Sequence, residues 1–443
     1  MKTAAPSSSS ERTAFQPGRR QAGMTFAILI TINILNYMDR TILPAVLPHL
    51  GKDFGLNNTE EGLLGSSFLL VYGLATLPLG MWADKGIRKN IVGICVGVWS
   101  VATTLAGFTQ NFMQLLLTRS VLGIGEAGYA PASLSMIGDF FPKEQRGRIL
   151  SYWSVSNVIG TALGLVIGGI VADTLGWRWA FYIVGLPGLI AAFLIWRAHE
   201  PRRGAFDTAD GDEHALQAGH GSLGGDIWGT ARKLIRIRTY WVLVAAFIFS
   251  FFIVGAAQFW IPKFIVGHFH LTAAQAGIIS GGVLAGGSIV GTIFGGWLAD
   301  YLQQRMPQGR MLVSTISFLL GAPLTLLALS LSNLTAFIAV FVLAIICLSM
   351  CLGPLNAIIQ DIIVPEMRAT GIGLVLLLAH LLGDAASPLI IGMIADASHS
   401  LGFALLITAP TCLLLAGIIC LFGLRTVALD MRAMQAQLHQ AQD

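Results

Sequence analysis

The residues with the clearest chemical potential are four charged side chains inside long apolar runs. Asp39 and Arg40 are adjacent in the apolar run at about 24–50, and Arg119 and Glu126 lie in a later run. A charged side chain at membrane depth costs at least ~2.5–3.5 kcal/mol, so such groups usually face a wet cavity or a partner. The four charges therefore predict one polar centre inside a membrane.

The two acids and the two arginines suggest different roles. Arginine stays protonated in proteins, whereas the protonation of a carboxylate changes with burial and with a nearby guanidinium. We predict that Asp39 and Glu126 carry protons, and that Arg40 holds an anionic head group or pairs with Glu126 when the site is empty. Arg119 and Glu126 are seven residues apart, which puts them on one helix face. Three glycines without side chains on that face would let a ligand or another helix approach closely: Gly123, Gly125 and Gly128. The alternative is a permanent salt bridge that pins two helices together.

A second charged group surrounds the loop between the second and third apolar runs. Asp84 ends the second run, and Arg88 can reach both Asp84 and Asp139. This cluster predicts a latch that closes the inner side while the outer side is open, and ordinary flanking charge is the alternative. The candidate gating residues are Asp84, Lys85, Arg88, Lys89, Asp139, Arg146 and Asp300.

The second half of the chain offers an apolar wall with a few polar groups. His380 and Asp384 are spaced i, i+4, so they share a helix face. Such a pair is either a hydrogen bond between helices or a proton relay. An apolar wall opposite a charged pole suits an amphipathic substrate. The predicted substrate-binding residues are Arg40, Arg119, Asn36, Tyr37, Tyr129, Gln258, Trp260 and His380.

The composition explains which elements must position these groups. Hydrophobic residues form 55% of the 443-residue chain, charged residues form 11%, and the mean hydropathy is +0.72. A soluble protein carries roughly 25% charged residues, so the excess apolar surface must face lipid. A membrane-spanning helix needs ~20 apolar residues, and irregular backbone cannot face lipid. Twelve windows meet this need and predict an all-α membrane protein: 24–50, 61–83, 91–110, 112–139, 149–173, 178–198, 239–262, 273–300, 310–331, 334–362, 370–396 and 401–424.

The distribution of basic residues predicts the orientation. With the amino terminus inside, the inner side receives 22 of the 27 Lys and Arg residues, and the outer side receives only Lys52, Arg178 and Lys263. Both termini are therefore expected in the cytoplasm. The net charge of +4 reflects this topology and not a nucleic-acid partner.

The chain repeats itself at fixed offsets. The spacing of Gly80 and Asp84 recurs at Gly296 and Asp300. Four further residues recur 223 positions later: Gly160, Gly169, Ala172 and Asp173 become Gly383, Gly392, Ala395 and Asp396. These echoes predict two six-helix bundles related by an axis along the membrane normal.

The predicted domains follow from the spans and the repeat. A cytoplasmic tail at 1–23 precedes the first bundle at 24–198, and a cytoplasmic linker at 199–238 joins it to the second bundle at 239–424. The linker either ends in an amphipathic segment on the inner membrane surface or is solvated throughout. A second cytoplasmic tail follows at 425–443.

Several function classes lack their signatures. The sequence contains no P-loop, dinucleotide fingerprint or Gly-x-Ser-x-Gly motif, so uphill transport would draw on an ion gradient. The five cysteines lie in apolar runs without zinc-like spacing. We predict no metal and no cofactor. A membrane-embedded enzyme would need a catalytic set beyond His380 and Asp384.

Two groups of motifs resemble a known family. The loop from Gly80 to Lys89 resembles the signature of the major facilitator superfamily, with Ile87 in place of its second glycine. Within that superfamily, the segments at 36–40, 123–127 and 146–148 (Asn-Tyr-Met-Asp-Arg, Gly-x-Gly-Glu-Ala and Arg-x-Arg) resemble the Spinster family of lipid transporters, in a bacterial-type homologue. The chain also approaches the organic-anion symporters of the anion:cation family, which have a similar Asp-Arg pair.

The Spinster resemblance implies the major facilitator fold and transport of lysophospholipids or sphingosine-1-phosphate-like lipids, with proton coupling in some members. In that case Arg40 would hold the anionic head, and Asp39 and Glu126 would take the proton. We expect a monomeric, proton-coupled, alternating-access transporter for an amphipathic anion, with lipid, substrate and protons as partners. The alternatives are a proton-coupled organic-anion symporter and a drug–proton antiporter. Short loops are typical of a bacterial inner membrane.

Overall fold

The computed structural model describes residues 19–201, 203, 232, 234–364 and 367–440, which are mostly helical. The first 18 residues and most of the linker predicted at 199–238 lie outside the described residues, and so does the first part of its amphipathic segment. The helices are α1 (Arg19–Phe54), α2 (Asn58–Lys85), α3 (Arg88–Ala106), α4 (Phe112–Ala127), α5 (Tyr129–Phe140), α6 (Lys143–Thr174), α7 (Trp177–Arg197), α10 (Arg238–Phe269), α11 (Ala273–Gln303), α12 (Gly309–Ser330), α13 (Leu334–Met350), α14 (Leu352–Ile362), α15 (Arg368–Ala379), the π-helix η2 (His380–Asp384), α16 (Ser387–Ala397) and α17 (Leu401–Gln440).

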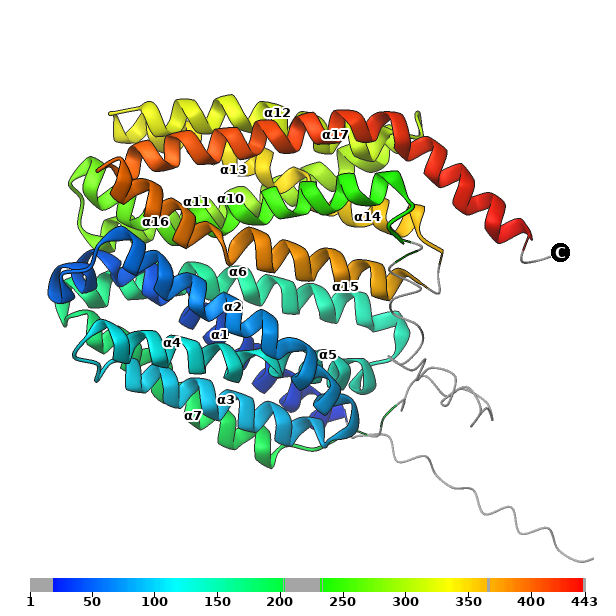
Figure 1. The fold of residues 1–443 in the computed structure, drawn as a ribbon. Helices are drawn as coiled ribbons and strands as arrows, with labels where there is room; N and C mark the ends of the chain where they lie inside the picture. Colours follow the sequence, from blue (N-terminus) through cyan, green and yellow to red (C-terminus); the bar gives the residue numbers. More distant parts are fainter. Residues whose placement is uncertain (1–18, 202, 204–231, 233, 365–366, 441–443) are drawn as a thin grey trace, which may run out of the picture.

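The helices form two halves that lie side by side (Figure 1). The N half contains α1 to α7, and the C half contains α10 to α17. The halves meet mainly where α6 packs on α11, α2 on α16, and α1 on α10. We call the end of the bundle where α1 begins and α17 ends the terminal face, and the other end the opposite face.

Corresponding helices of the two halves begin in the same way at the opposite face. Asn57 accepts from the backbone N–H of Glu60 at 2.8 Å, and the Glu60 side chain accepts from the Asn57 N–H at 3.0 Å. Thr272 and Gln275 form the same reciprocal pair at the start of α11, at 3.2 and 3.1 Å. Such a capping box satisfies amides that a helix cannot pair internally. The repeat therefore extends to how α2 and α11 begin.

Eleven stretches of described helix are long and apolar enough to cross a membrane. The remaining predicted span is the fourth, 112–139, which is divided at Gly128 into α4 and α5, each too short alone. Close packing on α3 accompanies this division. A Cβ added to Gly125 would lie 2.6 Å from the backbone nitrogen of Trp99, and one added to Gly128 would lie 2.8 Å from the Cys95 sulfur.

The last helix continues beyond its predicted end at residue 424 as far as Gln440. Its extension caps the first helix of the C half, because the Asp430 carboxylate accepts from the backbone N–H of Thr239 at 2.8 Å. The hydroxyls of Thr239 and Thr426 lie 2.7 Å apart. Part of the predicted tail at 425–443 is thus packed helix.

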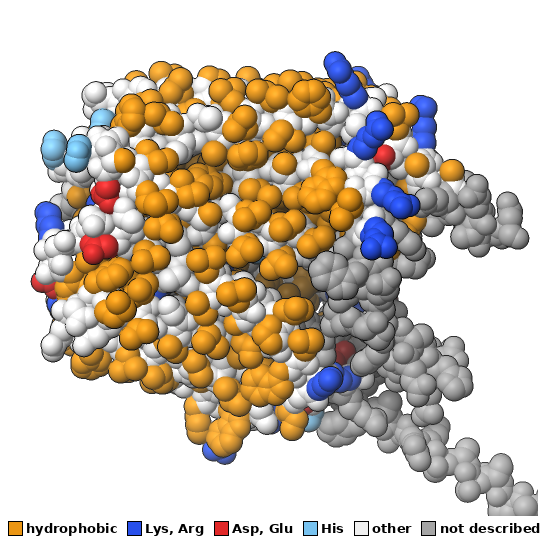
Figure 2. All heavy atoms as spheres, in the orientation of Figure 1, with side chains coloured by type: hydrophobic (Ala, Val, Ile, Leu, Met, Phe, Trp, Pro, Cys, Tyr) orange, Lys and Arg blue, Asp and Glu red, His pale blue; other side chains and the backbone are white. Residues whose placement is uncertain are grey.

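The surface divides into an apolar middle and charged ends. Figure 2 shows hydrophobic side chains over the middle of the molecule and Lys and Arg side chains gathered mainly toward the terminal face. Large apolar side chains are well exposed there, with Leu74 at 72% and Ile293 at 69%. Continuous apolar surface of this kind is not tolerated in water. The chain is an integral membrane protein.

Candidate functional site

Two arginine–carboxylate pairs form a charged core between α1 and α4. Arg40 Nε donates to Glu126 Oε2 at 2.7 Å, and Arg119 Nη1 lies 3.5 Å from Asp39 Oδ1. The Thr103 hydroxyl of α3 donates to the other Asp39 oxygen. Asp39, Arg119 and Glu126 are fully buried. The expected contact between Arg40 and Glu126 agrees with this geometry.

Each carboxylate of the core keeps one oxygen without a hydrogen-bond donor among the described residues. These atoms are Asp39 Oδ1 and Glu126 Oε1, and Arg119 Nε likewise has no acceptor. Buried polar groups are nearly always hydrogen-bonded, so exceptions usually have a functional cause. An oxygen without a donor can accept a proton, and an N–H without an acceptor can bind an anion.

Aromatic rings surround the Arg40 guanidinium. Its carbon lies 4.6 Å from the ring centre of Tyr72, 5.2 Å from that of Tyr37 and 5.5 Å from that of Phe68. The Arg119 guanidinium lies 5.1 Å from the same Phe68 ring. Cation–π attraction holds a guanidinium in place without neutralising its charge. The rings therefore fix Arg40 and leave its charge available.

A buried polar network orients α1 beneath the charged core. The Tyr129 hydroxyl donates to Asn33 Oδ1 at 2.5 Å and lies 3.2 Å from Asn36 Oδ1. Asn33 Nδ2 in turn donates to Ser156 Oγ at 2.6 Å. These bonds join α1, α5 and α6. Because Asn36 lies one helical turn before Arg40, the network sets the rotation of α1 that points Arg40 at its partner.

The charged core borders a cavity of about 220 Å³ between the halves. Arg40, Arg119 and Tyr37 line it from the N half. Gln258 of α10 and His380 of η2 line it from the C half. Since both arginines reach this wall, the cavity presents positive charge on one side.

A second cavity of about 170 Å³ adjoins the first and shares Tyr37, Val254 and Gln258 with it. Its remaining lining is uncharged and mostly small or apolar: Asn157, Val158, Thr161, Ala257, Leu284, Ala285, Ser288, Ile345, Leu348 and Ser349. A charged chamber that adjoins an uncharged one matches the two ends of an amphipathic molecule.

The His380–Asp384 pair faces the first cavity from a π-helical turn. His380 Nδ1 lies 2.9 Å from Asp384 Oδ2, and both residues line the cavity. The His380 ring packs edge-on against Phe251 and Tyr72, at centroid distances of 5.0 and 6.4 Å. Short π-helical turns inside α-helices occur frequently at functional sites. The pair thus lies on the cavity wall and also contacts α2 of the N half.

The cavity is closed toward the opposite face. There α6 and α11 touch so closely that a Cβ on Gly169 would lie 2.3 Å from the carbonyl oxygen of Ala273. Toward the terminal face of the same helices, a Cβ on Gly147 or Gly296 would meet no atom within 4 Å. Figure 2 shows a hollow between the halves on that side. The halves therefore diverge toward the terminal face.

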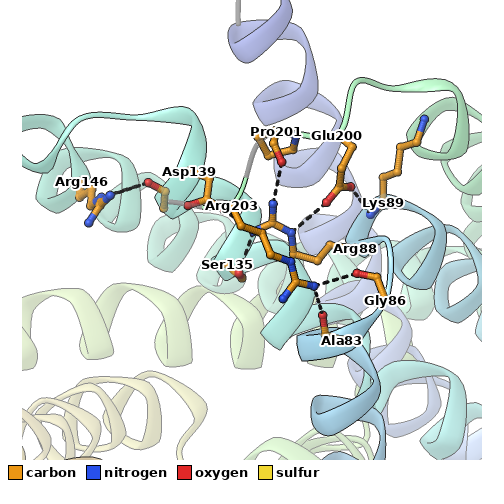
Figure 3. A network of polar contacts seen from close by, with 11 residues as sticks. Ala83, Gly86, Arg88, Lys89, Ser135, Asp139, Arg146, Glu200, Pro201 and Arg203 are labelled. Atoms are coloured by element: carbon orange, nitrogen blue, oxygen red, sulfur yellow. Dashed lines mark hydrogen bonds and ion pairs between the residues drawn. The ribbon is translucent and has the colours of Figure 1, made fainter. Parts of the chain in front are cut away.

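Arg88 organises a network at the terminal face of the N half (Figure 3). Its buried guanidinium pairs with Asp139 and donates to Glu200 Oε1 at 2.9 Å, Ser135 Oγ at 3.0 Å and the Pro201 carbonyl at 2.9 Å. These partners come from α5 and the segment after α7. The network therefore stabilises the N half. None of the bonds named here reaches the C half in this conformation.

The C half has a counterpart to this network. Arg310 donates to Asp361 at 2.6 Å and to Asp300 at 2.9 Å. Arg310 and Asp361 follow Arg88 and Asp139 by the same 222 positions. Each half therefore carries an arginine between carboxylates, and the predicted latch role of these groups stays a prediction.

The other gating candidates lie beside the Arg88 network. Lys89 Nζ donates to the carbonyl oxygen that follows α7 at 2.8 Å, and Arg146 donates to a carbonyl oxygen of α5 at 2.7 Å. Lys85 is exposed. The side chain of Asp84 lies outside the part of the chain that the structure describes.

Comparison of the chain with known proteins identifies its family. The family model described as Major Facilitator Superfamily matches residues 29–386. Protein spinster of Drosophila melanogaster is 30% identical over 85% of this chain, but the match spans only 62% of that protein. Protein spinster homolog 3 of Danio rerio is also 30% identical, over 85% of this chain and 78% of that protein. The chain belongs to the Spinster family of the major facilitator superfamily.

Solved structures support the same fold for this Spinster-family chain. A crystal structure of a bacterial homologue to the human lysosomal transporter Spinster, inward-facing and unoccupied, matches with a TM-score of 0.78. The match covers 94% of this chain and 98% of that chain at 24% identity. The occupied, inward-facing form of such a homologue matches with a TM-score of 0.77. Likeness at this identity shows the fold alone.

The structure sorts the predicted substrate-binding residues of this Spinster-family chain into two groups. Arg40, Arg119, Tyr37, Gln258 and His380 line the first cavity. The other three line neither cavity: Asn36, Tyr129 and Trp260.

In this conformation these three residues take supporting positions, and direct binding by them stays a prediction. Trp260 is fully buried and donates its indole N–H to the Pro388 carbonyl at 3.2 Å. Asn36 and Tyr129 are also fully buried and belong to the network beneath the core. In each case the polar end that suggested a ligand contact faces a neighbouring helix.

Sequence reasoning missed several residues of the site. Phe68 and Tyr72 of α2 contact the Arg40 guanidinium, and Phe251 of α10 lines the cavity. They lie in uniformly apolar spans, where residue type does not distinguish positions that face lipid from positions that face the cavity. Their four-residue spacing, which puts Phe68 and Tyr72 on one face, was the available signal.

Proposed function

We propose that this protein is a proton-coupled secondary transporter of an amphipathic anion, such as a lysophospholipid or a sphingosine-1-phosphate-like lipid. The Arg40–Glu126 pair on the wall of a cavity between two halves carries the proposal. The pair combines an anion-binding group with a proton-binding group that competes for it. Membership in a transporter family supports the transport step itself.

The anionic head group would bind at Arg40 and Arg119. Both guanidinium groups line the cavity, and Arg119 Nε has no acceptor among the described residues. Guanidinium groups bind phosphate and carboxylate through paired N–H donors. The aromatic rings around Arg40 exclude water from that contact, which strengthens it.

The tail would extend into the second, uncharged cavity. Its wall carries aliphatic side chains such as Leu284, Ile345 and Leu348 and adjoins the charged cavity at Tyr37 and Gln258. Burial of an acyl chain there contributes about 0.8 kcal/mol per methylene. A sugar acid would gain nothing from this chamber, which favours the lipid over the organic-anion alternative.

Protons would couple to the head group through the carboxylates. When Glu126 takes a proton on its unpaired oxygen, its attraction for Arg40 weakens and the guanidinium becomes available to the substrate. Asp39 would act on Arg119 in the same way. Binding and protonation thus favour each other, which is the condition for coupled transport by alternating access.

The terminal face would be the cytoplasmic side of a cell membrane, with both termini inside. Most Lys and Arg side chains in Figure 2 gather toward that face, as the positive-inside rule requires. With the opposite face closed, the conformation would be open toward the cytoplasm. We propose that the working unit is a monomer, because each half already supplies one wall of the cavity.

Reconstitution of the purified protein into liposomes with an imposed proton gradient tests the function. We expect uptake of lysophosphatidylglycerol and thermal stabilisation by it, because a ligand stabilises the state that binds it. Monoacylglycerol of the same chain length is the matched control, since it keeps the tail and lacks the phosphate. Uptake of glucuronate in place of the lipid would support the organic-anion alternative, and uptake of tetraphenylphosphonium would refute anion transport.

A further inference from the structure

The two aspartates at the end of the internal repeat lie at the closed opposite face. Asp173 is near the end of α6 and Asp396 near the end of α16, so they occupy corresponding positions in the two halves. Neither takes part in the site or the cavities described above. Each instead reaches the first turn of a helix from the other half.

Asp396 of the C half binds the start of α2 in the N half. Its Oδ1 accepts from the backbone N–H of Asn58 at 3.0 Å and from the Asn58 side chain at 2.8 Å. Its Oδ2 accepts from the backbone N–H of Thr59 at 2.8 Å and from the Thr59 hydroxyl at 2.5 Å. Four hydrogen bonds to one carboxylate therefore join the halves at this point.

Asp173 of the N half makes the equivalent contact with the start of α11 in the C half. Its oxygens accept from the backbone N–H groups of Ala273 at 3.3 Å and Ala274 at 2.7 Å. His49 Nε2 of α1 lies 3.2 Å from the same carboxylate. A negative charge at a helix start is also favoured by the helix dipole.

The capping boxes of α2 and α11 do not pair the first two backbone N–H groups of either helix, so these amides are free to bind an aspartate of the other half. Asn57 and Thr272 each bind the third N–H of their helix, at Glu60 and Gln275. The first and second N–H groups of each helix are those that bind Asp396 or Asp173. When the halves separate, these four amides lose their charged acceptor and must turn to water.

Glycines allow the close approach that the carboxylates need. On the α2–α16 side, a Cβ at Gly62 would lie 2.3 Å from the Pro388 carbonyl oxygen, and one at Gly392 would lie 2.3 Å from the Asn58 carbonyl oxygen. On the α6–α11 side, a Cβ at Gly277 would lie 2.2 Å from the carbonyl oxygen of Leu165. Both contact surfaces are thus fitted backbone to backbone.

The α2–α16 side carries one further charged pair. Lys263 of α10 pairs with the fully buried Glu61 of α2 and donates to Asn58 Oδ1 at 2.9 Å. Asn58 therefore connects Asp396 and Lys263, both from the C half, with α2 of the N half. The two sides share the aspartate contact but differ in the charges beside it.

We propose that Asp173 and Asp396 form a two-part latch that holds the opposite face closed and opens whenever the cavity turns toward that face. The latch sets the balance between the two conformations, because its bonds exist in only one of them. This inference rests on alternating access in the proposed function, but not on the lipid or the proton steps.

Hydrogen–deuterium exchange of the purified protein, read by mass spectrometry, tests the latch. The variants are Asp173→Asn, Asp396→Asn and the double variant, since asparagine keeps the size and loses the charge and one acceptor. We expect each single variant to accelerate exchange about tenfold at the starts of both α2 and α11, because losing one charge-assisted contact shifts the shared opening equilibrium. The double variant should accelerate it further.

Exchange at the helix start that does not face the substituted aspartate distinguishes a shared latch from a local helix cap. Exchange that rises only at the helix start facing the substituted aspartate would overturn the proposal. Asn333→Ala is the matched control, because Asn333 caps α13 within the C half at 3.0 Å from the Ala336 nitrogen. Its effect should stay at α13.

A milder variant covers the case in which an aspartate variant does not fold. Thr59→Val removes only one hydroxyl donor from Asp396 and should raise exchange at both helix starts by a smaller factor. No change at α11 in a folded Thr59→Val protein would count against the latch. Because the assay uses neither substrate nor gradient, its result is independent of whether the lipid-transport experiment succeeds.

Discussion

Glu126 holds Arg40 with one carboxylate oxygen and keeps the other without a donor among the described residues. A proton and a guanidinium therefore compete for one side chain. This competition is the smallest unit in which the proposed coupling can be tested. Substitutions at this scale should separate proton coupling from anion binding.

Replacement of Glu126 by glutamine should uncouple the protein. The amide still accepts from Arg40 through its carbonyl oxygen but cannot take up and release a proton. We expect gradient-driven uptake to fall by about tenfold or more, which corresponds to ~1.4 kcal/mol. Substrate exchange without a gradient should persist in the same liposomes. Full gradient-driven uptake by Glu126→Gln would remove this residue from the coupling step.

Replacement of Arg40 should weaken anion binding in a graded way. Arg40→Lys keeps the charge but loses the paired donors and much of the stacking, so affinity for a phosphate-headed lipid should fall about tenfold. Arg40→Ala should lower it by about a hundredfold. Arg20→Ala is the control, because Arg20 lies exposed on the same helix. Unchanged affinity in Arg40→Ala, measured by thermal shift, would exclude the head-group role.

The charged core was largely predictable because charge in an apolar run is a strong signal. Arg40 and Glu126 were expected to meet, and they do. The aromatic partners Phe68 and Tyr72 were missed, because their four-residue spacing puts both rings on one helix face but does not show that this face turns inward. Trp260 shows that a polar group in a span has two readings, because the indole N–H that suggested a ligand contact donates to the Pro388 carbonyl in this conformation.

At the scale of elements, the division of the fourth span is the feature closest to the site. α4 ends at Ala127, one residue after Glu126, and α5 begins at Tyr129 of the supporting network. Close packing of Gly125 against α3 holds the end of α4 in place. The position of Glu126 therefore depends on a backbone contact that has no charge at all.

Gly125→Ala should disturb that contact. Its Cβ would lie 2.6 Å from the Trp99 nitrogen and 2.9 Å from the Trp99 Cβ, so α4 must move from α3. Such overpacking typically costs about 1–3 kcal/mol of unfolding free energy. The thermal unfolding midpoint should fall accordingly. A Cβ at Gly138 in α5 would meet no atom within 4 Å, and alanine favours a helix over glycine, so Gly138→Ala should not lower the midpoint. An equal fall in both variants would contradict the packing explanation.

The spans were predictable from hydropathy, but their interruptions were not. Breaks at Gly128 and Cys351 and the π-helical turn at His380 depend on packing between helices that are distant in sequence. The continuation of α17 depends on such a contact too, because Asp430 binds α10. Composition reports how long an apolar run is and carries little information about its neighbours.

At the scale of the whole molecule, the repeat predicted two related halves, and the structure adds which surfaces join them. The sequence marked Asp173 and Asp396 only as echoes of one another. Their partners at Ala274 and Thr59 lie in the other half and could not be read from spacing. The linker predicted at 199–238 falls mostly outside the described residues.

The orientation of the whole molecule is directly testable. Because 22 of the 27 Lys and Arg residues are assigned to the side of the terminal face, we expect that face in the cytoplasm. Green fluorescent protein fused after Asp443 should fluoresce in intact cells, and alkaline phosphatase fused there should be inactive. The same fusions after Leu175, in the loop between α6 and α7, should give the reverse pattern. The same pattern at both sites would refute the orientation.

The contact between Asp430 and Thr239 also bears on the order of assembly. The two residues are 191 positions apart, so a ribosome has released the start of α10 long before it makes the acceptor that completes it. Until then the Thr239 amide of α10 lacks this acceptor. The start of α10 can therefore gain this acceptor only late in synthesis.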